Sequence, residues 1–428
     1  MESYQIEDLL ITAHKKGASR FGKFSYPIRY GQFSEIRTAT NSFQFNLNGE
    51  IRFIQGRGNG WPYPAEWLKR SAGNDWVYYS AGDYKGVYDL LGEYYYPYLP
   101  YPSNSILGDN PLKGPQLRSA INSCTALREK ARELVSRSMP DQVKRLLLRI
   151  AENTPRVLRS KAALLHRVIG GRATVLPPDS RHVDYDVIPL TVAEGCLLKC
   201  GFCRVKSGRG FKQWSAGAIL DEIQSLKQLY GEDLRNYNAL FLGQHDALHA
   251  GRDIILFAAE NAYELFQFER SSMEEPVLFL FGSPLSMIAT EENLFEALDS
   301  LPYSTVYINI GLEAADCATL RGLKRPVTAE TVHEAFALML DINRRYKKIE
   351  VTANFVFGDQ FSPDHFESLV DLTTNRLDPV RAKGALYLSP VVDESSIDEA
   401  RRREILRRFR DLKTHSRLPT YLYLIQRL

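Results

Sequence analysis

The sequence is poor in cysteine and has no long apolar segment. It holds five cysteines in 428 residues, and an odd number of which three are clustered does not form a disulfide framework. No run of about 18 apolar residues occurs, so no segment is expected to span a membrane. The first ten residues are acidic and mixed, without the basic and apolar stretches of a secretory signal. Together these absences favour a cytoplasmic protein.

The composition, 44% hydrophobic and 25% charged, is typical of a globular protein, and the length allows two or three domains. We predict four regions along the chain. They are an aromatic-rich, β-containing N-terminal domain at 1–112, a basic helical connector at 113–180, a domain of repeated strands and helices at 181–393, and a C-terminal helical segment at 394–428.

Strand-like and helix-like segments alternate regularly after residue 180. Continuous apolar runs are typical of a parallel sheet that is covered on both faces, either an open doubly wound sheet or a barrel. Because eight units close a barrel, six would leave it partial. The predicted strands are 186–192, 239–243, 276–282, 305–311, 349–358 and 385–391.

The N-terminal region follows a different pattern. Residues 35–56 alternate around Asn48-Gly49, which predicts a hairpin. Residues 61–101 hold three of the four tryptophans and ten of the 23 tyrosines, which favours an aromatic core or interface over a substrate-stacking surface. Residues 118–172 read as helices with 13 Lys/Arg against four Asp/Glu. Solvated helix faces or an RNA-binding surface would explain this charge.

Three cysteines, Cys196, Cys200 and Cys203, follow the first predicted strand as C-x3-C-x2-C. A structural zinc site would need a fourth Cys or His, and Cys124 and Cys317 are far away in sequence. A [4Fe–4S] cluster normally takes four thiolates, so three would leave one iron open to another ligand. The pattern favours the cluster, with zinc as the alternative.

This motif, placed after the first of six strand–helix units, resembles the cluster motif of the radical S-adenosylmethionine (SAM) enzymes. The resemblance covers about residues 184–391 and implies an α/β fold with a partial (β/α)6 TIM-like barrel, behind an α+β N-terminal domain. It also implies that Cys196, Cys200 and Cys203 each bind one iron of a [4Fe–4S] cluster. SAM would bind the fourth iron through its amino and carboxylate groups, and its reductive cleavage would give a 5′-deoxyadenosyl radical that abstracts hydrogen from the substrate.

The same resemblance implies residues that contact SAM. Phe202 occupies the place of an aromatic residue that packs near the adenine. Gln244 and Asp246 follow the second strand, where family members hold the amino group, although the family's Gly-Gly-Glu-type stretch reads LGQHDAL here. Asp246 could equally cap the following helix. His245 could act on the substrate or simply be exposed.

Residues after the later strands complete this predicted site. Glu313 lies where the family often binds the ribose hydroxyls; the alternative is an ion pair with Lys324 or Arg325. Val356, Phe357 and Gly358 match the adenine-contacting segment of the fifth strand, where a glycine would let the backbone approach a flat ring. Ordinary burial is the alternative for the two apolar residues.

The segment GLEAADCATLRGLKRPVTAETVHEAF looks like the subgroup that includes the elongator catalytic subunit, tRNA methylthiotransferases and oxygen-independent coproporphyrinogen oxidase. We expect an enzyme with an external flavodoxin-like or ferredoxin-like electron donor. A small-molecule substrate is favoured, and RNA is the alternative. A zinc-stabilised binding protein without turnover is the hypothesis from another class.

Overall fold

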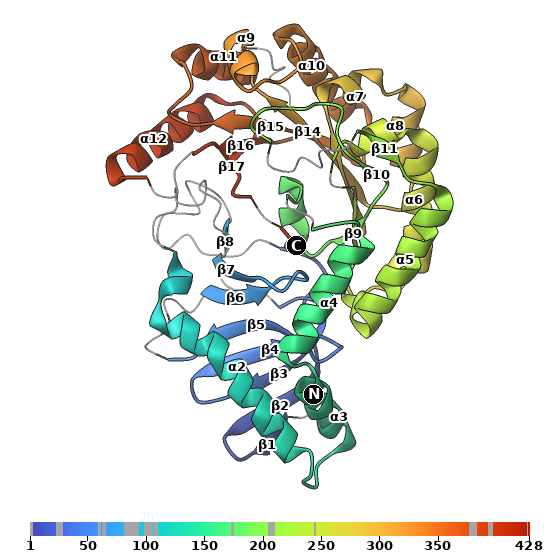
Figure 1. Ribbon diagram of the computed structural model, residues 1–428, viewed down its shortest axis with the longest axis vertical. Coiled ribbons are helices and arrows are strands. Elements are labelled where there is room, and N and C mark those ends of the chain that lie inside the picture. Colours follow the sequence, from blue (N-terminus) through green and yellow to red (C-terminus); the bar gives the residue numbers. More distant parts are fainter. Residues whose placement is uncertain are drawn as a thin grey trace.

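The computed structural model contains two sheets, an antiparallel N-terminal sheet and a parallel sheet that curves into a partial barrel (Figure 1). Helices surround the outer side of the parallel sheet, as the predicted fold class requires. None of the described helices is long and apolar enough to cross a membrane. The residues described are 3–22, 29–58, 61, 66–80, 94–97, 106, 110–172, 175–203, 210–243, 245–375, 383–392, 397–425 and 427–428.

The N-terminal sheet is an eight-stranded antiparallel meander in chain order. The predicted hairpin is confirmed: β4 pairs with β5, and Gly49 takes a φ of +75°, which favours glycine. Trp67 of this sheet is buried and stacks on Phe53, while residues 81–93 of the aromatic segment lie outside the described residues. The strands are β1 Ser3–Ile6, β2 Leu9–Lys16, β3 Gln32–Arg37, β4 Asn41–Phe45, β5 Ile51–Gly56, β6 Glu66–Arg70, β7 Trp76–Ser80 and β8 Tyr94–Pro97.

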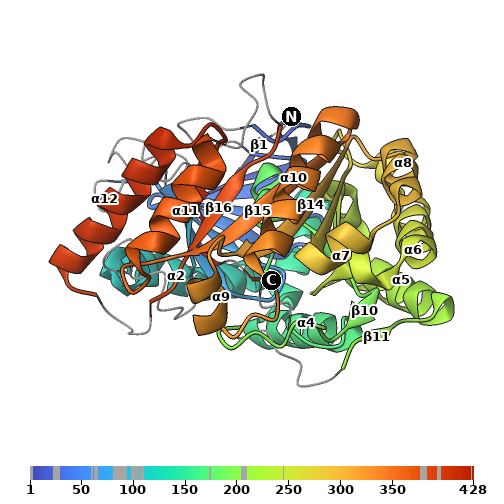
Figure 2. The same cartoon turned by 90° about the horizontal axis from the view of Figure 1, so that it is seen from above.

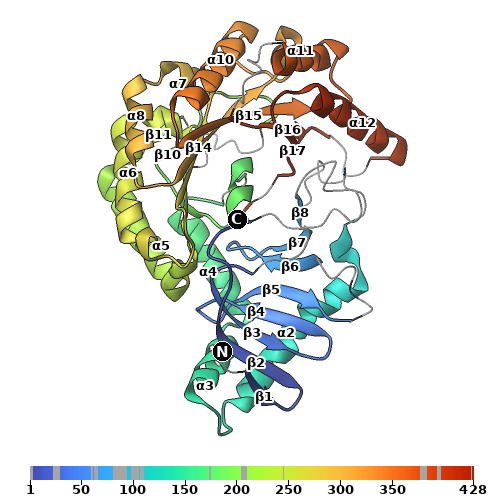
Figure 3. The ribbon, with the colours of Figure 1, turned by 180° about the vertical axis from the view of Figure 1, so that it is seen from behind.

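Three helices, α2 Pro115–Leu134, α3 Asp141–Glu152 and α4 Pro155–Val168, follow this sheet, so the basic segment is helical as predicted. Figure 3 shows α2 and α3 beside the N-terminal strands, where their apolar residues join the core of that sheet. The helix α4 continues from this core to that of the barrel, because Leu158 packs in the first and Leu165 in the second.

The barrel sheet has seven parallel strands in the order β17-β16-β15-β14-β13-β12-β9. All six predicted strands are present. The structure adds β17, three residues long, which pairs with β16 after the last helix. The strands are β9 Ile188–Leu190, β12 Ala239–Leu242, β13 Val277–Gly282, β14 Thr305–Glu313, β15 Ile349–Phe357, β16 Leu386–Pro390 and β17 Thr420–Leu422.

Two of the helices that cover the barrel begin at a side chain that caps the first turn. Ser215 caps α5 by accepting a hydrogen bond from the Ala218 amide, and Thr328 caps α10 in the same way. Figure 2 shows α10, α11 and α12 across the strands β14 to β16. The helices are α5 Ala216–Tyr230, α6 Arg252–Leu265, α7 Pro284–Ala289, α8 Glu292–Ser300, α9 Cys317–Gly322, α10 Ala329–Arg345, α11 Pro363–Thr374 and α12 Glu399–His415.

A short 3₁₀ helix, Pro178–Val183, packs against the amino-terminal halves of the barrel strands. Asp179, fully buried, accepts hydrogen bonds of 2.6 Å from Thr352 of β15 and from Tyr387 of β16. The His182 ring stacks on Tyr307 of β14 at 5.0 Å. These contacts show which face of the sheet points inward. The 3₁₀ helix fills the amino-terminal end of that face.

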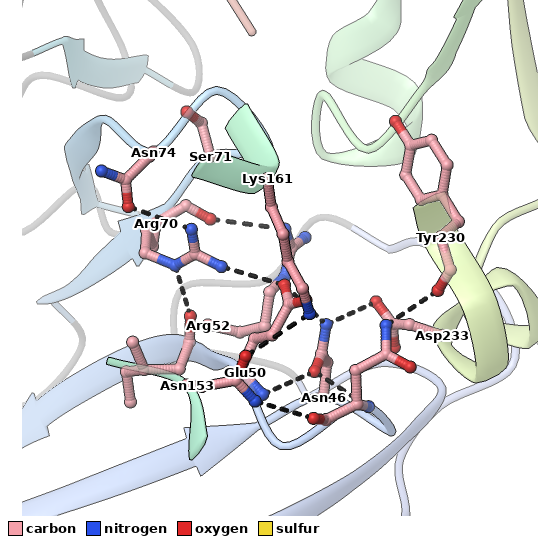
Figure 4. Close-up of polar contacts among 12 residues, drawn as sticks. Asn46, Glu50, Arg52, Arg70, Ser71, Asn74, Asn153, Lys161, Tyr230 and Asp233 are labelled. Atoms are coloured by element: carbon pink, nitrogen blue, oxygen red, sulfur yellow. Dashed lines mark hydrogen bonds and ion pairs between the residues drawn. The ribbon is translucent and has the colours of Figure 1, made fainter. Parts of the chain in front are cut away.

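Buried polar contacts join the N-terminal sheet to the barrel (Figure 4). Glu50 is bound by Arg70 at 3.1 Å and by Lys161 of α4 at 2.5 Å. Asn46 donates to Asp233, which lies between α5 and β12, at 3.0 Å. Because removing one partner of such a buried pair is costly, these contacts hold the two sheets in one arrangement.

A second set of ion pairs lies on the segment that enters the barrel. Asp186 binds Arg52 at 2.5 Å and Lys69 at 3.1 Å. Burial opposes ionisation of Asp186, but the two cations outweigh it, and the pKa of Asp186 lies below its usual range. At the other end of the chain, Arg427 binds Asp75 at 2.9 Å. Both the start of the barrel and the end of the chain are therefore anchored to the N-terminal sheet.

Candidate functional site

The three clustered cysteines lie on a loop whose two ends are paired. Ala193–Glu194 (β10) forms an antiparallel ladder with Lys212–Gln213 (β11), and the Trp214 amide donates to the Val192 carbonyl at 3.0 Å. The loop therefore begins and ends at the carboxyl end of β9. Residues 204–209 within it are outside the described part.

Cys196, Cys200 and Cys203 all lie on this loop. Cys200 is 3% exposed and the other two thiols are half-buried. Burial raises the pKa of the Cys196 thiol, and negative charge on Asp246 and the other two cysteines raises it further, which places these groups near one another. In the described part of the chain, no three His, Cys, Asp or Glu side chains converge on the position of a single metal ion.

Arg325, which is 8% exposed, connects the cysteine loop to the end of β14. Its guanidinium donates to the Cys200 sulfur at 3.2 Å and to the Gly311 carbonyl oxygen. Cysteine sulfurs are the usual protein ligands of iron–sulfur clusters. Three sulfur donors, one of them beside a buried cation, are therefore a donor set that fits an iron–sulfur cluster.

The backbone of the loop is also held to this region. The Gly201 amide donates to the Leu323 carbonyl at 2.8 Å. A side chain at position 201 would have its Cβ at 3.1 Å from that carbonyl oxygen and at 3.2 Å from Lys324. The close approach therefore favours glycine between the second and third cysteines.

Asp246 is 5% exposed and leaves one carboxylate oxygen without a partner among the described residues. The other oxygen accepts a 2.7 Å hydrogen bond from Ser286 of α7. The side chain does not cap the 3₁₀ helix Ala247–Ala250 that follows, so the capping alternative is wrong. A buried acceptor near Cys196 that lacks a donor fits the ammonium group of SAM.

The structure describes only one of the two residues that precede Asp246 in the motif. Gln244 lies outside the described residues. His245 is half-buried rather than exposed, and burial lowers the pKa of its imidazole.

Glu313 lies at a β-bulge at the end of β14, with a φ of +69°. Its carboxylate is 3.9 Å from the Arg325 guanidinium. The sequence suggested an ion pair with Lys324 or Arg325, and the structure contains the pair with Arg325. Burial raises the pKa of Glu313, and the charge on Arg325 opposes this shift. The role of Glu313 at a ribose remains a prediction.

Val356 and Phe357 are both buried, but they face opposite sides of β15, because successive side chains of a strand alternate. Val356 shares the inner face with Thr352. Its carbonyl accepts a 3.0 Å hydrogen bond from His365, whose other ring nitrogen is 3.1 Å from Asp316. Gly358 approaches the Val391 carbonyl, where a Cβ would lie at 3.0 Å.

Phe202 is half-buried and packs against the barrel core. It therefore remains a candidate for the adenine contact.

The inner face of the barrel sheet carries apolar side chains on β12 and β13 and polar side chains on β14, β15 and β16. Phe281 packs edge-on against Phe241 at 5.5 Å. On β15, Asn354 donates to Asn309 of β14 at 2.5 Å; the register places Ser389 of β16 beside Val356. Phe281, Asn354 and Ser389 are half-buried, so they leave part of their surface open toward the carboxyl end of the sheet.

Comparison with known proteins was made for the whole chain, and no family model matches it. A curated relative is the ribosomal protein uS12 methylthiotransferase RimO of Chloroflexus aurantiacus, 26% identical over 198 residues, which are 45% of this chain and 40% of that protein. The RimO of Herpetosiphon aurantiacus is 22% identical over 187 residues, which are 42% of this chain and 37% of that protein. The matches thus span about two fifths of each relative.

Methylthiotransferases are among the enzymes whose cysteine motif resembles that of this chain. The chain also contains the parallel barrel that this resemblance implies. The comparison therefore supports the resemblance to radical SAM enzymes. A solved radical SAM methyltransferase from Sphaerobacter thermophilus aligns with a TM-score of 0.40 and 14% identity over 55% of this chain and 65% of that one. These relatives support the resemblance to radical SAM enzymes, which use a [4Fe–4S] cluster and SAM.

The sequence missed several polar contacts that support this site. Ser286, Arg325 and His365 contact predicted site residues from elements far away in the chain. Glu222 of α5 is a fourth: it is buried and accepts a 2.7 Å hydrogen bond from the Thr191 amide, directly before the cysteine loop. Its second oxygen has no partner among the described residues.

Glu222 makes the stability depend on pH. Burial raises the pKa of Glu222 to about 8, so the folded protein retains a proton that the unfolded chain releases near the ordinary value of 4.5. Stability is therefore lost as pH rises from about 4.5 to 8. Glu222→Gln mimics the protonated acid, and we expect urea unfolding to give equal stabilities at pH 5 and a more stable variant, by roughly 1–3 kcal/mol, at pH 8. The exposed Glu296→Gln is the control; equal stabilities at both pH values for Glu222→Gln would contradict the prediction.

Asp246→Asn should weaken SAM binding, because a neutral amide cannot supply the negative charge that an ammonium group prefers. Charge-assisted hydrogen bonds contribute about 1.5–3 kcal/mol, so we expect the dissociation constant of SAM to rise at least tenfold in calorimetry with the cluster-loaded protein. Asp253→Asn, on the exposed first turn of α6, should bind SAM like the unchanged protein. Unchanged affinity in Asp246→Asn would exclude this role for Asp246.

Proposed function

We propose that this chain uses a [4Fe–4S] cluster held by Cys196, Cys200 and Cys203 to cleave SAM reductively and to abstract hydrogen from a substrate at the inner face of the barrel. When bound, the cofactors supply a 5′-deoxyadenosyl radical. The contribution of the chain is to hold the cofactors, orient the substrate and exclude water.

The observation that carries this proposal is the unpartnered carboxylate oxygen of Asp246 beside the cysteine loop. In the proposed site it accepts an N–H of the SAM amino group, while Ser286 keeps the carboxylate in place through its 2.7 Å hydrogen bond. Glu313 accepts from the ribose hydroxyls, and Arg325 limits its motion. Phe202, Val356 and Gly358 border the adenine.

The substrate that suits the inner face is a small amphipathic molecule. Phe281, backed by the buried Phe241, offers an apolar wall, whereas Asn354 and Ser389 offer hydrogen-bonding groups on the opposite side. Asn354 uses one N–H on Asn309, which leaves a second N–H for a ligand. The 3₁₀ helix Pro178–Val183 occupies the amino-terminal end, so a substrate would enter from the cysteine side.

The cofactor proposal is tested by anaerobic reconstitution with iron and sulfide. The protein should bind about four irons per chain, turn brown and release 5′-deoxyadenosine from SAM under a strong reductant. Cys200→Ala should lose this release by at least 100-fold, because the cluster loses one of its three protein ligands. Cys124→Ala, at a half-buried position of α2, should retain it. A colourless protein with one zinc per chain would show that the alternative, a zinc-stabilised binding protein, is correct.

RNA is a second candidate substrate, favoured by the outer surface of α3 and α4. Arg145, Arg156, Arg159 and Arg167 are exposed and have no ion-pair partner within the described residues. If this surface binds RNA, the affinity for a structured RNA should fall steeply between 50 and 200 mM salt, and Arg156→Glu/Arg159→Glu should reduce the salt slope. Filter binding measures both; weak, salt-independent binding would exclude RNA and leave the small molecule.

A further inference from the structure

A cavity of about 300 Å³ lies at the amino-terminal end of the barrel, away from the cysteine loop. Its walls come from the connection between β2 and β3, from the 3₁₀ helix Pro178–Val183 and from β17, which pairs with β16 near the start of that strand. Small-molecule sites measure roughly 300–1,000 Å³, so this cavity is large enough for a small ligand. The side chains that argue for a ligand are half-buried: Phe21, Tyr30, Arg181, His182 and Tyr421.

Arg181 is the cation of this cavity. Its guanidinium lies 4.2 Å from the centre of the Tyr421 ring, and its Nε donates to the Tyr387 hydroxyl at 3.1 Å. That hydroxyl donates in turn to Asp179 at 2.6 Å, so two contacts set the orientation of the guanidinium. Its remaining N–H groups have no acceptor among the described residues. They are therefore available to a ligand.

The carboxylates around the cavity do not neutralise this cation. Asp184, which also lines the cavity, pairs with Lys69 at 3.6 Å. Asp179 and Glu350 act on Arg181 only through space, since neither forms an ion pair with it in the described structure. Burial raises the pKa of both acids, which reduces the negative charge that they offer. The cavity therefore keeps a positive charge beside its aromatic rings.

The aromatic wall opposite the 3₁₀ helix is held in place by the rest of the chain. Phe21 packs on Tyr30 with the ring centres 4.7 Å apart, and the Tyr30 hydroxyl donates to the Gly22 carbonyl at 2.7 Å. Close by, the Ser19 carbonyl accepts from the Glu274 amide at 2.6 Å, which ties this connection to the barrel. A wall that is already ordered adds little to the entropic cost of binding.

A charged fork beside flat rings suits a flat anion. A guanidinium binds a carboxylate through two parallel N–H···O bonds, and aromatic rings pack well against the ring of a ligand. We propose that this cavity is a second ligand site, separate from the cluster site, and that it binds a small aromatic carboxylate. The carboxylate group binds Arg181, while the ring of the ligand packs against Phe21 and Tyr30.

Binding here also acts on the joint between the two sheets. Phe21 and Tyr30 belong to the N-terminal sheet region, whereas Arg181 and Tyr421 belong to the barrel side. A ligand that contacts both binds the folded arrangement and not the unfolded chain, so it raises the melting temperature as its concentration rises. The site is thus a point at which a small molecule stabilises the contact between the N-terminal sheet and the barrel.

The test is calorimetric titration of the full, cluster-loaded chain with 2-naphthoate. We expect this probe to bind at least tenfold more tightly than its neutral amide, which lacks the charge, and than acetate, which lacks the ring. Arg181→Lys keeps the charge but loses the planar fork, and should weaken binding at least tenfold. Phe21→Ala should weaken it at least threefold. Arg410→Lys, on the exposed side of α12, is the matched control and should bind like the unchanged protein.

Each outcome decides the proposal. A tenfold loss in Arg181→Lys, with 2-naphthoate still bound when SAM is saturating, supports it. Equal affinities for 2-naphthoate and its amide, or for 2-naphthoate and acetate, would overturn it, as would displacement of the probe by SAM. If Arg181→Lys does not fold, Phe21→Ala decides, because Phe21 lies outside the barrel strands; unchanged affinity in that variant overturns the site. The proposed function at the cysteine loop stands in either case.

Discussion

The parallel direction of the barrel strands is the constraint on which the rest of this structure depends. Because all seven strands run the same way, the loops after them meet at one edge, and residues separated by more than 100 positions become neighbours there. The opposite end is occupied by the 3₁₀ helix that buries Asp179 between β15 and β16. Chemistry is thereby confined to the side that carries the cysteine loop.

Arg325 links the parts of that side. One guanidinium contacts Cys200, Gly311 and, at 3.9 Å, Glu313, so the loop after β9 and the bulge at the end of β14 share a buried cation. The N-terminal sheet contributes at a distance: its ion pairs with Asp186 and its contacts with Asp233 hold the segments that enter β9 and β12. Buried pairs of this kind fix one arrangement because each partner is costly to leave alone.

The sequence predicted the barrel strands because these depend on local signals. Apolar runs marked six of them. β17 was missed since three residues are too short for a periodic pattern to be recognised. Contacts such as Ser286 to Asp246 and Arg325 to Cys200 could not be predicted, because they join residues 40 and 125 positions apart. The opposite orientations of Val356 and Phe357, in contrast, follow from strand alternation alone, and the SAM contacts stay predictions.

The most direct test of the account is electron–nuclear double resonance of the reduced, cluster-loaded protein with SAM labelled with ¹⁵N at the amino group. Three cysteine ligands leave one iron open, and Asp246 is proposed to hold the amino group that reaches it. The account predicts a ¹⁵N coupling that is strong in the unchanged protein and weakened or lost in Asp246→Asn at equal SAM occupancy. A fully formed cluster without any ¹⁵N coupling at saturating SAM would contradict it.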